Sequence, residues 1–224
     1  MNNLPSGISR KNPSIGAYNS HSIAIRGNAI EYLTEPQINA LTKAFQAYYD
    51  SNEKKAQKIN RGRYWLTFLV LRYTGARIGE VLSIDDRTDI DFRNAEIKLI
   101  TLKQKHKKTR RRPPTRIVPV PSILTNEIAN YIATYPAMRG KIFHLAQGNF
   151  RRKFYELAEI AGIDRELAHP HILRHSRAIE LLRAGVPVTI VQNILGHAYL
   201  TTTALYLQIS GQDAKNILKE KGMI

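Results

Sequence analysis

The sequence predicts a mainly helical fold with one small antiparallel β-sheet, an α+β arrangement built as one domain over residues 31–224. Apolar residues recur at helical spacing along most of the chain after Thr34, and glycines follow several of these stretches as stop signals. The period changes to two between residues 95 and 120, where apolar and charged residues alternate. Residues 1–30 are rich in Asn, Ser, Gly and Pro, which predicts a flexible or extended N-terminal arm.

The first helix is predicted to open at Thr34, because Gln37 follows three residues later in a capping-box pattern. Residues 50–63 are polar and basic, which indicates a loop. Residues 64–73 are apolar almost throughout and predict a core helix that the glycine at position 75 ends. Further helices are predicted around Arg77 and Glu80, over residues 123–135, 150–161, 172–184 and 187–196, around Tyr206, and over residues 213–221.

The alternating residues 95–120 predict a β-hairpin, and its connecting segment is strongly basic. Between Lys103 and Arg116 there are four lysines and four arginines, and no acidic residue. A basic run of this kind is ordinarily a solvated loop. The charge of the whole chain instead favours an anionic partner. The candidate DNA-binding residues are Lys105, Lys107, Lys108, Arg110, Arg111, Arg112 and Arg116.

Composition narrows the class of protein. The 34 Lys and Arg residues against 18 Asp and Glu residues give a formal net charge of +16, and a field of that sign concentrates nucleic acid or anionic lipid. A ribosomal or membrane-surface role would fit the charge as well. No apolar run approaches the roughly 18 residues of a spanning helix, and the N-terminus lacks a secretory signal, so we expect a soluble, cytoplasmic protein. The absence of cysteine excludes disulfides, thiolate zinc sites and a cysteine nucleophile.

Four short motifs carry the candidate chemistry. Each has a plain structural explanation by itself: a surface arginine, an i, i+3 surface pair, a helix C-cap and a half-buried aromatic ring. Together they supply two guanidiniums, two imidazoles and one phenol, a set suited to a phosphate diester. The motifs are Thr-Gly-Ala-Arg ending at Arg77, His171 with Arg174, Leu-Gly-His ending at His197, and Tyr206 nine residues after it.

In this order the motifs resemble those of the tyrosine recombinases, the phage-integrase family of site-specific DNA recombinases. The resemblance covers the chain from about Thr34 to its end and implies the tyrosine recombinase catalytic-domain fold. It implies cleavage and rejoining of DNA strands through a 3′-phosphotyrosyl intermediate, in integration, excision or inversion, with no metal or other cofactor. It also implies double-stranded DNA at a specific recombination site as partner, a homotetramer on DNA and a monomer or weak oligomer when free.

The resemblance also implies a role for each matching residue. A phenol with a pKa near 10 is only about 0.1% ionised at neutral pH, so the nucleophile needs a base, and imidazole titrates in the right range. Two arginines can hold the charge that develops on the phosphate oxygens. A lysine of the basic hairpin would protonate the leaving oxygen, with Lys105 nearly as good a candidate as Lys103. The implied catalytic set is Arg77, Lys103, His171, Arg174, His197 and the nucleophile Tyr206.

Two features depart from the family. Residues 1–30 stand where many relatives carry a separate helical domain, so we expect no N-terminal core-binding domain. The basic tip of the hairpin also lacks the usual glycine turn. In the cell we expect association with the nucleoid, in a prokaryotic, viral or mobile-element context.

Three alternatives stay open at this point. A type IB topoisomerase uses a similar set of side chains without exchanging strands. The closely spaced His169, His171 and His175 are candidate metal ligands, although metal hydrolases usually add carboxylates. The third alternative is a catalytically silent DNA-binding or architectural protein.

Overall fold

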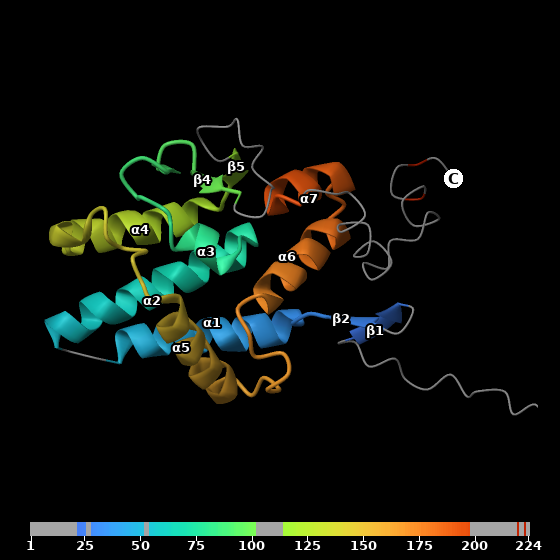
Figure 1. Ribbon diagram of the computed structural model, residues 1–224, viewed down its shortest axis with the longest axis horizontal. Coiled ribbons are helices and arrows are strands. Elements are labelled where there is room, and N and C mark those ends of the chain that lie inside the picture. The colour runs from blue at the N-terminus through green and yellow to red at the C-terminus, as the bar shows by residue number, and fades with distance from the viewer. Residues whose placement is uncertain are drawn as a thin grey trace, which may run out of the picture.

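The computed structural model describes residues 22–25, 28–51, 54–101 and 114–197, together with residues 219 and 222. Over this part of the chain the fold is mainly helical, as the sequence predicts, with two small antiparallel sheets where the sequence predicts one (Figure 1). The helices are α1 (Glu35–Asp50), α2 (Lys55–Thr74), α3 (Ile78–Val81), α4 (Ser122–Thr134), α5 (Gln147–Ile160), α6 (Ile172–Arg183) and α7 (Val188–Leu195), with a 3₁₀ turn at Pro136–Met138. The strands are β1 (Ser22–Ile25), β2 (Asn28–Glu31), β3 (Ile90–Asp91), β4 (Glu96–Ile100) and β5 (Thr115–Pro119).

Helix α2 is the central element, because it contacts α1, α3, α4 and α6. The predicted core stretch is buried along it, and Phe68 stacks on Phe45 of α1 with ring centroids 4.2 Å apart. Phe150 and Phe154 of α5 complete this aromatic cluster from the other side of Phe45. Buried rings of this size contribute much of the stability of a core. The cluster therefore anchors α5 to the α1–α2 pair, and Figure 1 shows α5 crossing α1.

The loop predicted over residues 50–63 is wrong from residue 55 onward, since α2 begins at Lys55. Arg61 of α2 donates hydrogen bonds to the main-chain oxygen of Tyr48 (3.0 Å) and to the hydroxyl of Ser51 (2.7 Å), which ties the N-terminal part of α2 to the end of α1. Gly62 lies so close to the Tyr131 ring that a Cβ atom would overlap it. Polar residues with good helix propensity thus extend the helix because tertiary contacts hold them.

The predicted hairpin is confirmed as strands β4 and β5, which pair in an antiparallel ladder with Ile97 opposite Val118. Both of these side chains face the core, as the alternation predicts. Strand β3 adds a third, short member on the other edge of β4, in the order β3-β4-β5. The sequence did not indicate β3, which has only two residues and no period to read.

Strands β1 and β2 pair with each other inside the segment expected to be an arm, with Ser22 opposite Glu31. Whether residues 1–30 act as an arm separate from the domain stays a prediction. The helices predicted around Tyr206 and over residues 213–221 lie outside the described residues, apart from the helical position Lys219. In the described part of the chain, no helix combines the length and apolar character needed to span a membrane.

Helices α6 and α7 form a second, smaller core at the right of Figure 1. Both helices agree closely with their predicted ranges. Strand β5 contacts α7, so the sheet and this smaller core meet. The buried members of the smaller core are Tyr32, Ala178, Ile179, Leu182, Val191 and Leu195.

Candidate active site

Arg77 is placed by a sharp reversal between α2 and α3. Gly75 ends α2 with φ of 62°, in the left-handed region that a side chain rarely adopts. A Cβ atom at this position would also lie 2.7 Å from the Leu195 side chain of α7, so the close approach of α7 requires glycine too. Arg77 is the N-cap residue of α3, and its side chain is 19% exposed. The turn therefore leaves this guanidinium partly exposed, while Gly75 and Ala76 before it are buried.

A buried carboxylate, Glu80, lies directly behind Arg77. Its Oε1 accepts from Nη1 of Arg77 at 3.0 Å, and its Oε2 accepts from the Arg77 main-chain nitrogen at 3.0 Å. Nη2 of Arg116 lies 2.7 Å from the same Oε2. Burial raises the pKa of Glu80, but the hydrogen bond and charge of Arg116, with the contacts to Arg77, hold it below its usual value. Glu80 is therefore ionised at neutral pH.

Arg116 departs from the expectation that it contacts DNA. Its side chain is only 9% exposed and pairs with Glu80. It also donates to the main-chain oxygen of Ile194 through Nε (2.8 Å) and to the hydroxyl of Thr101 through Nη1 (3.2 Å). A guanidinium committed to three protein acceptors has little left for a phosphate. We therefore remove Arg116 from the DNA-contacting set.

Arg174 brings α6 to the reversal at Gly75. Its side chain is almost completely buried, at 2% exposure. Nη1 donates to the main-chain oxygen of Gly75 at 2.8 Å, across 99 residues of sequence. The two arginine motifs are thus joined directly, although neither sequence pattern mentions the other.

His171 stands at the N-terminus of α6 and faces solvent, and its ring meets that of His175 edge-on with centroids 4.8 Å apart. Partial burial lowers the pKa of His171, and the charges of His175, Arg174, His169 and Arg77 lower it further. These influences require the groups to be near one another. His171 is therefore a neutral imidazole at physiological pH, able to accept a proton.

His197 follows the Gly196 cap of α7, where φ is 69°. Its side chain is 8% exposed. Burial lowers the pKa of His197 to about 3, and the charges of Arg174 and Arg77 act in the same direction. The same two arginines therefore influence both His171 and His197. Four predicted residues from three regions of the sequence, Arg77, His171, Arg174 and His197, form one cluster.

A groove of about 580 Å³ opens beside this cluster and contains Arg77 and His171 in its wall. Its opposite wall is α5, through Gln147, Arg151 and Tyr155. A larger groove of about 950 Å³ shares Arg151 and Tyr155, so the two hollows adjoin along this helix. None of the sequence motifs includes these three residues. Their spacing of four along the polar face of α5, away from Phe150 and Phe154, is the signal that could have indicated them.

The remaining predicted site residues lie outside the described residues. They are Lys103, Lys105, Lys107, Lys108, Arg110, Arg111, Arg112 and Tyr206. Across the described ranges, no group of three or more His, Cys, Asp or Glu side chains is placed to hold a metal ion. In the triplet considered above, His171 and His175 pack edge to face.

Known proteins with similar sequences and folds belong to one family. Residues 31–212 match the model of the phage integrase family. A tyrosine recombinase of Thermosipho africanus is 29% identical over 203 residues, which cover 88% of this chain and 63% of the relative. A tyrosine recombinase of Pseudothermotoga lettingae is 28% identical, over 87% of this chain and 68% of the relative. The chain thus spans about two thirds of the length of these relatives.

Solved structures agree with this relationship at the level of the fold. The XerA recombinase superposes with a TM-score of 0.63 at 23% identity, covering 96% of this chain and 66% of that one. The catalytic domain of bacteriophage HP1 integrase gives a TM-score of 0.57 at 20% identity, over 84% of this chain and 93% of that one. The fold is therefore that of a tyrosine recombinase catalytic domain.

Proposed function

The chain belongs to the phage integrase family, and from this membership we propose that it is a site-specific DNA recombinase acting through a 3′-phosphotyrosyl intermediate. The observation that carries the proposal is the clustering of Arg77, Arg174, His171 and His197 beside an open groove. Two guanidiniums and two imidazoles in one cluster match the needs of a single phosphate diester.

Charge stabilisation falls to the two arginines. Attack on a phosphate diester makes a pentacoordinate transition state with extra negative charge on its non-bridging oxygens. The planar guanidinium forks of Arg77 and Arg174 can donate to those oxygens. Arg174 is held by Gly75 and Arg77 by Glu80, so both are oriented before the substrate arrives. Removal of one such preorganised donor typically lowers the rate by about 10²- to 10³-fold.

His171 accepts the proton of the attacking phenol in this proposal. His197 is a further hydrogen-bond donor to the phosphate. His171 is neutral before DNA binds, because burial and neighbouring positive charges lower its pKa. An anionic phosphate in the groove offsets those positive charges and raises the pKa again. His171 therefore becomes a better base when the substrate is in place.

The bond changes follow from these roles. The phenol oxygen of Tyr206 attacks phosphorus while its proton passes to His171, and the bond from phosphorus to the 5′ oxygen breaks. Lys103, or Lys105 in its place, gives that oxygen a proton. A free 5′ hydroxyl and a 3′-phosphotyrosyl linkage result. Religation to a different 5′ hydroxyl reverses the same steps and exchanges the strands.

We further propose double-stranded DNA at a specific recombination site as the substrate, bound by a homotetramer. The polar face of α5 supports a path for the duplex, because Gln147, Arg151 and Tyr155 continue the groove away from Arg77. The related XerH recombinase has been crystallised bound to its difH site. Lys105, Lys107, Lys108, Arg110, Arg111 and Arg112 are the proposed phosphate contacts of the basic hairpin, and association with the nucleoid follows from the same charge.

The experiment that tests the proposal traps the covalent intermediate. The full chain is incubated with a pool of nicked duplexes of randomised sequence, denatured in SDS and separated by size. A nick next to the cut releases the short 5′ fragment and prevents religation, so the adduct accumulates. We expect a protein–DNA band that Tyr206→Phe abolishes and Tyr199→Phe retains.

Sequencing the trapped DNA gives the site, which is then built into two labelled duplexes. Exchange of labelled strands between them is expected for a recombinase. Relaxation of a supercoiled plasmid without exchange would assign the chain to the type IB topoisomerase alternative. Binding without any SDS-resistant band would assign it to the catalytically silent alternative.

A further inference from the structure

We propose that Arg116 is a positioning residue, which orients the phosphate-binding Arg77 through the shared carboxylate of Glu80. This inference rests on the proposed function for its catalytic consequence. Its structural part concerns three side chains of the described chain and stands independently.

Arg116 joins three segments that otherwise have no polar link among the contacts described here. Nη2 pairs with Glu80 in α3 at 2.7 Å. Nε donates to the main-chain oxygen of Ile194 in the last turn of α7, three residues before His197. Nη1 donates to Thr101 at the end of β4, immediately before the basic connection. One planar group therefore fixes the distances between α3, the last turn of α7 and the residue that follows β4.

The guanidinium is also confined by packing. Gly196 leaves space for it, because a Cβ atom at that position would lie 2.8 Å from Nη1 of Arg116. The positive φ of Gly196 adds a second reason for glycine there. The side chain is 9% exposed, and Glu80 beside it is completely buried. A largely buried guanidinium with three protein acceptors has few alternative positions, so it can serve as a fixed reference for its neighbours.

Arg116 affects the orientation of Arg77 because the two oxygens of the Glu80 carboxylate accept from different donors. Oε2 is occupied by Arg116 and by the Arg77 main-chain nitrogen, which leaves Oε1 for Nη1 of Arg77. Arg77 is therefore held by one of its two terminal nitrogens. Without Arg116, the Glu80 carboxylate loses one of the three donors that fix its position, so its ion pair with Arg77 loosens. The Arg77 guanidinium would then no longer be held in one orientation beside the groove.

The test uses Arg116→Lys, which keeps the charge opposite Glu80 but cannot reach all three acceptors. Arg63→Lys is the matched control, because Arg63 also bridges separate segments through main-chain oxygens, those of Ile142 and His144. Nitrogen-detected NMR of the free protein reports exchange of the Arg77 side-chain protons with water. We expect exchange to accelerate at least about 10-fold in Arg116→Lys, as for a loosened ion pair, and to stay unchanged in Arg63→Lys.

The second readout is the rate of DNA cleavage. The substrate is the nicked duplex that the unaltered chain traps in the experiment above. Under single turnover at saturating DNA we expect Arg116→Lys to be slower by about 10- to 100-fold, the scale of a misplaced catalytic group. DNA affinity and its salt dependence should be those of the unaltered chain. In an Arg77→Lys background the same substitution should cost less than about 2-fold, because a residue that acts through Arg77 has nothing left to position.

Each outcome decides between the claims. Unchanged Arg77 exchange in Arg116→Lys, or an equal loss of rate with and without Arg77, overturns the inference. A shallower salt dependence would return Arg116 to the DNA-contacting residues and overturn it as well. If the unaltered chain forms no covalent protein–DNA adduct, the proposed function is wrong. The NMR comparison would still decide whether Arg116 positions Arg77. If Arg116→Lys does not fold, Glu80→Gln is measured instead, with the same expected gain in Arg77 exchange.

Discussion

Nη1 of Arg174 lies 2.8 Å from the main-chain oxygen of Gly75 and donates a hydrogen bond to it. This contact joins α6 to the end of α2, and it places the second arginine motif against the reversal that presents the first. A lysine could not make it in the same way, because its single ammonium lacks the planar fork.

Arg174→Lys should therefore lower the rate of DNA cleavage far more than the affinity for DNA. We expect cleavage to fall by about 10²- to 10³-fold, since the preorganised donor to the phosphate is displaced. The free energy of unfolding should fall by about 1–3 kcal/mol, because a buried hydrogen bond is lost. Single-turnover cleavage and urea unfolding measure the two effects. Arg183→Lys on the same helix, where the guanidinium contacts the hydroxyl of Tyr32, should change cleavage little; equal losses in both variants would contradict this reading.

Stability should fall as the pH is lowered from about 6.5 to 4. Burial lowers the pKa of His197 to about 3 and that of His175 to about 4. In this window the unfolded chain binds protons at these positions and the folded chain does not, so acid favours unfolding. Each imidazole contributes up to about 1.4 kcal/mol per pH unit, and solvent screening reduces the share of the partly exposed His175. Above the unfolded pKa of about 6.5 the effect is absent.

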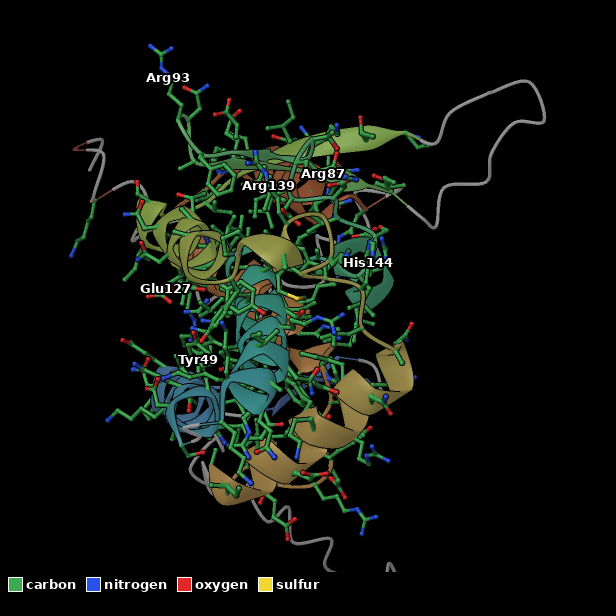
Figure 2. The ribbon with its side chains drawn as sticks, turned by 90° about the vertical axis from the view of Figure 1, so that its left-hand side faces the viewer. Tyr49, Arg87, Arg93, Glu127, Arg139 and His144 are labelled. Atoms are coloured by element: carbon green, nitrogen blue, oxygen red, sulfur yellow. The ribbon has the colours of Figure 1, made fainter. Side chains whose placement is uncertain are left out.

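Urea unfolding at a series of pH values checks this slope. His197→Gln should flatten it, since one of the titrating groups is removed. His144→Gln is the control, because His144 is exposed on the left-hand face that Figure 2 presents. The carboxylate Glu80, whose pKa is lowered, loses its stabilising charge only as the pH falls through that lowered value. An unchanged slope in His197→Gln would show that the ring is protonated in the folded state.

The salt dependence of DNA binding should respond to the arginines of the basic hairpin. Replacing Arg110, Arg111 and Arg112 together with glutamine should lower the slope of log K against log salt by up to about 2.7, at 0.9 for each phosphate contact. The matched control replaces Arg87, Arg93 and Arg139 with glutamine, which removes the same charge. Arg87 and Arg139 are labelled close together in Figure 2, and Arg93, in the turn after β3, projects away from them. Equal changes in both triple variants would indicate a general effect of net charge.

Phe45→Ala should destabilise the whole domain, because Phe45 is fully buried between the Phe68 ring and the two rings of α5. We expect a loss of about 3–5 kcal/mol in the free energy of unfolding. Ile160→Ala, at a site 74% exposed, should change stability by less than about 0.5 kcal/mol. Thermal and urea unfolding of the two variants test whether this aromatic cluster is the main core.

Much of the helical fold follows from local sequence. The capping box at Thr34 forms as predicted, with Gln37 Oε1 accepting from the Thr34 main-chain nitrogen at 2.9 Å. The glycine stops at positions 75 and 196 adopt the left-handed conformation that ends a helix. The errors fall where local patterns are weak. The polar start of α2 is helical because Arg61 and Gly62 are held by other elements, and β3 is too short to show a period.

The same distinction between local sequence and tertiary structure applies to the candidate active site. The motifs around Arg77, His171, Arg174 and His197, read in order, indicate the family, because spacing along one helix or around one turn is written in consecutive residues. That these motifs come together is decided only by the fold. The fold also decides the role of Arg116. In sequence Arg116 is part of the basic run, but its contacts are with Glu80, 36 residues earlier, and with Ile194, 78 residues later. A local sequence period cannot predict these two contacts of Arg116. The burial of a side chain and its hydrogen-bond partners are set only when distant elements pack together. The sequence by itself determined which chemical groups the chain carries and on which helices, while the tertiary structure decided which guanidiniums face the groove and which are buried to hold others in place.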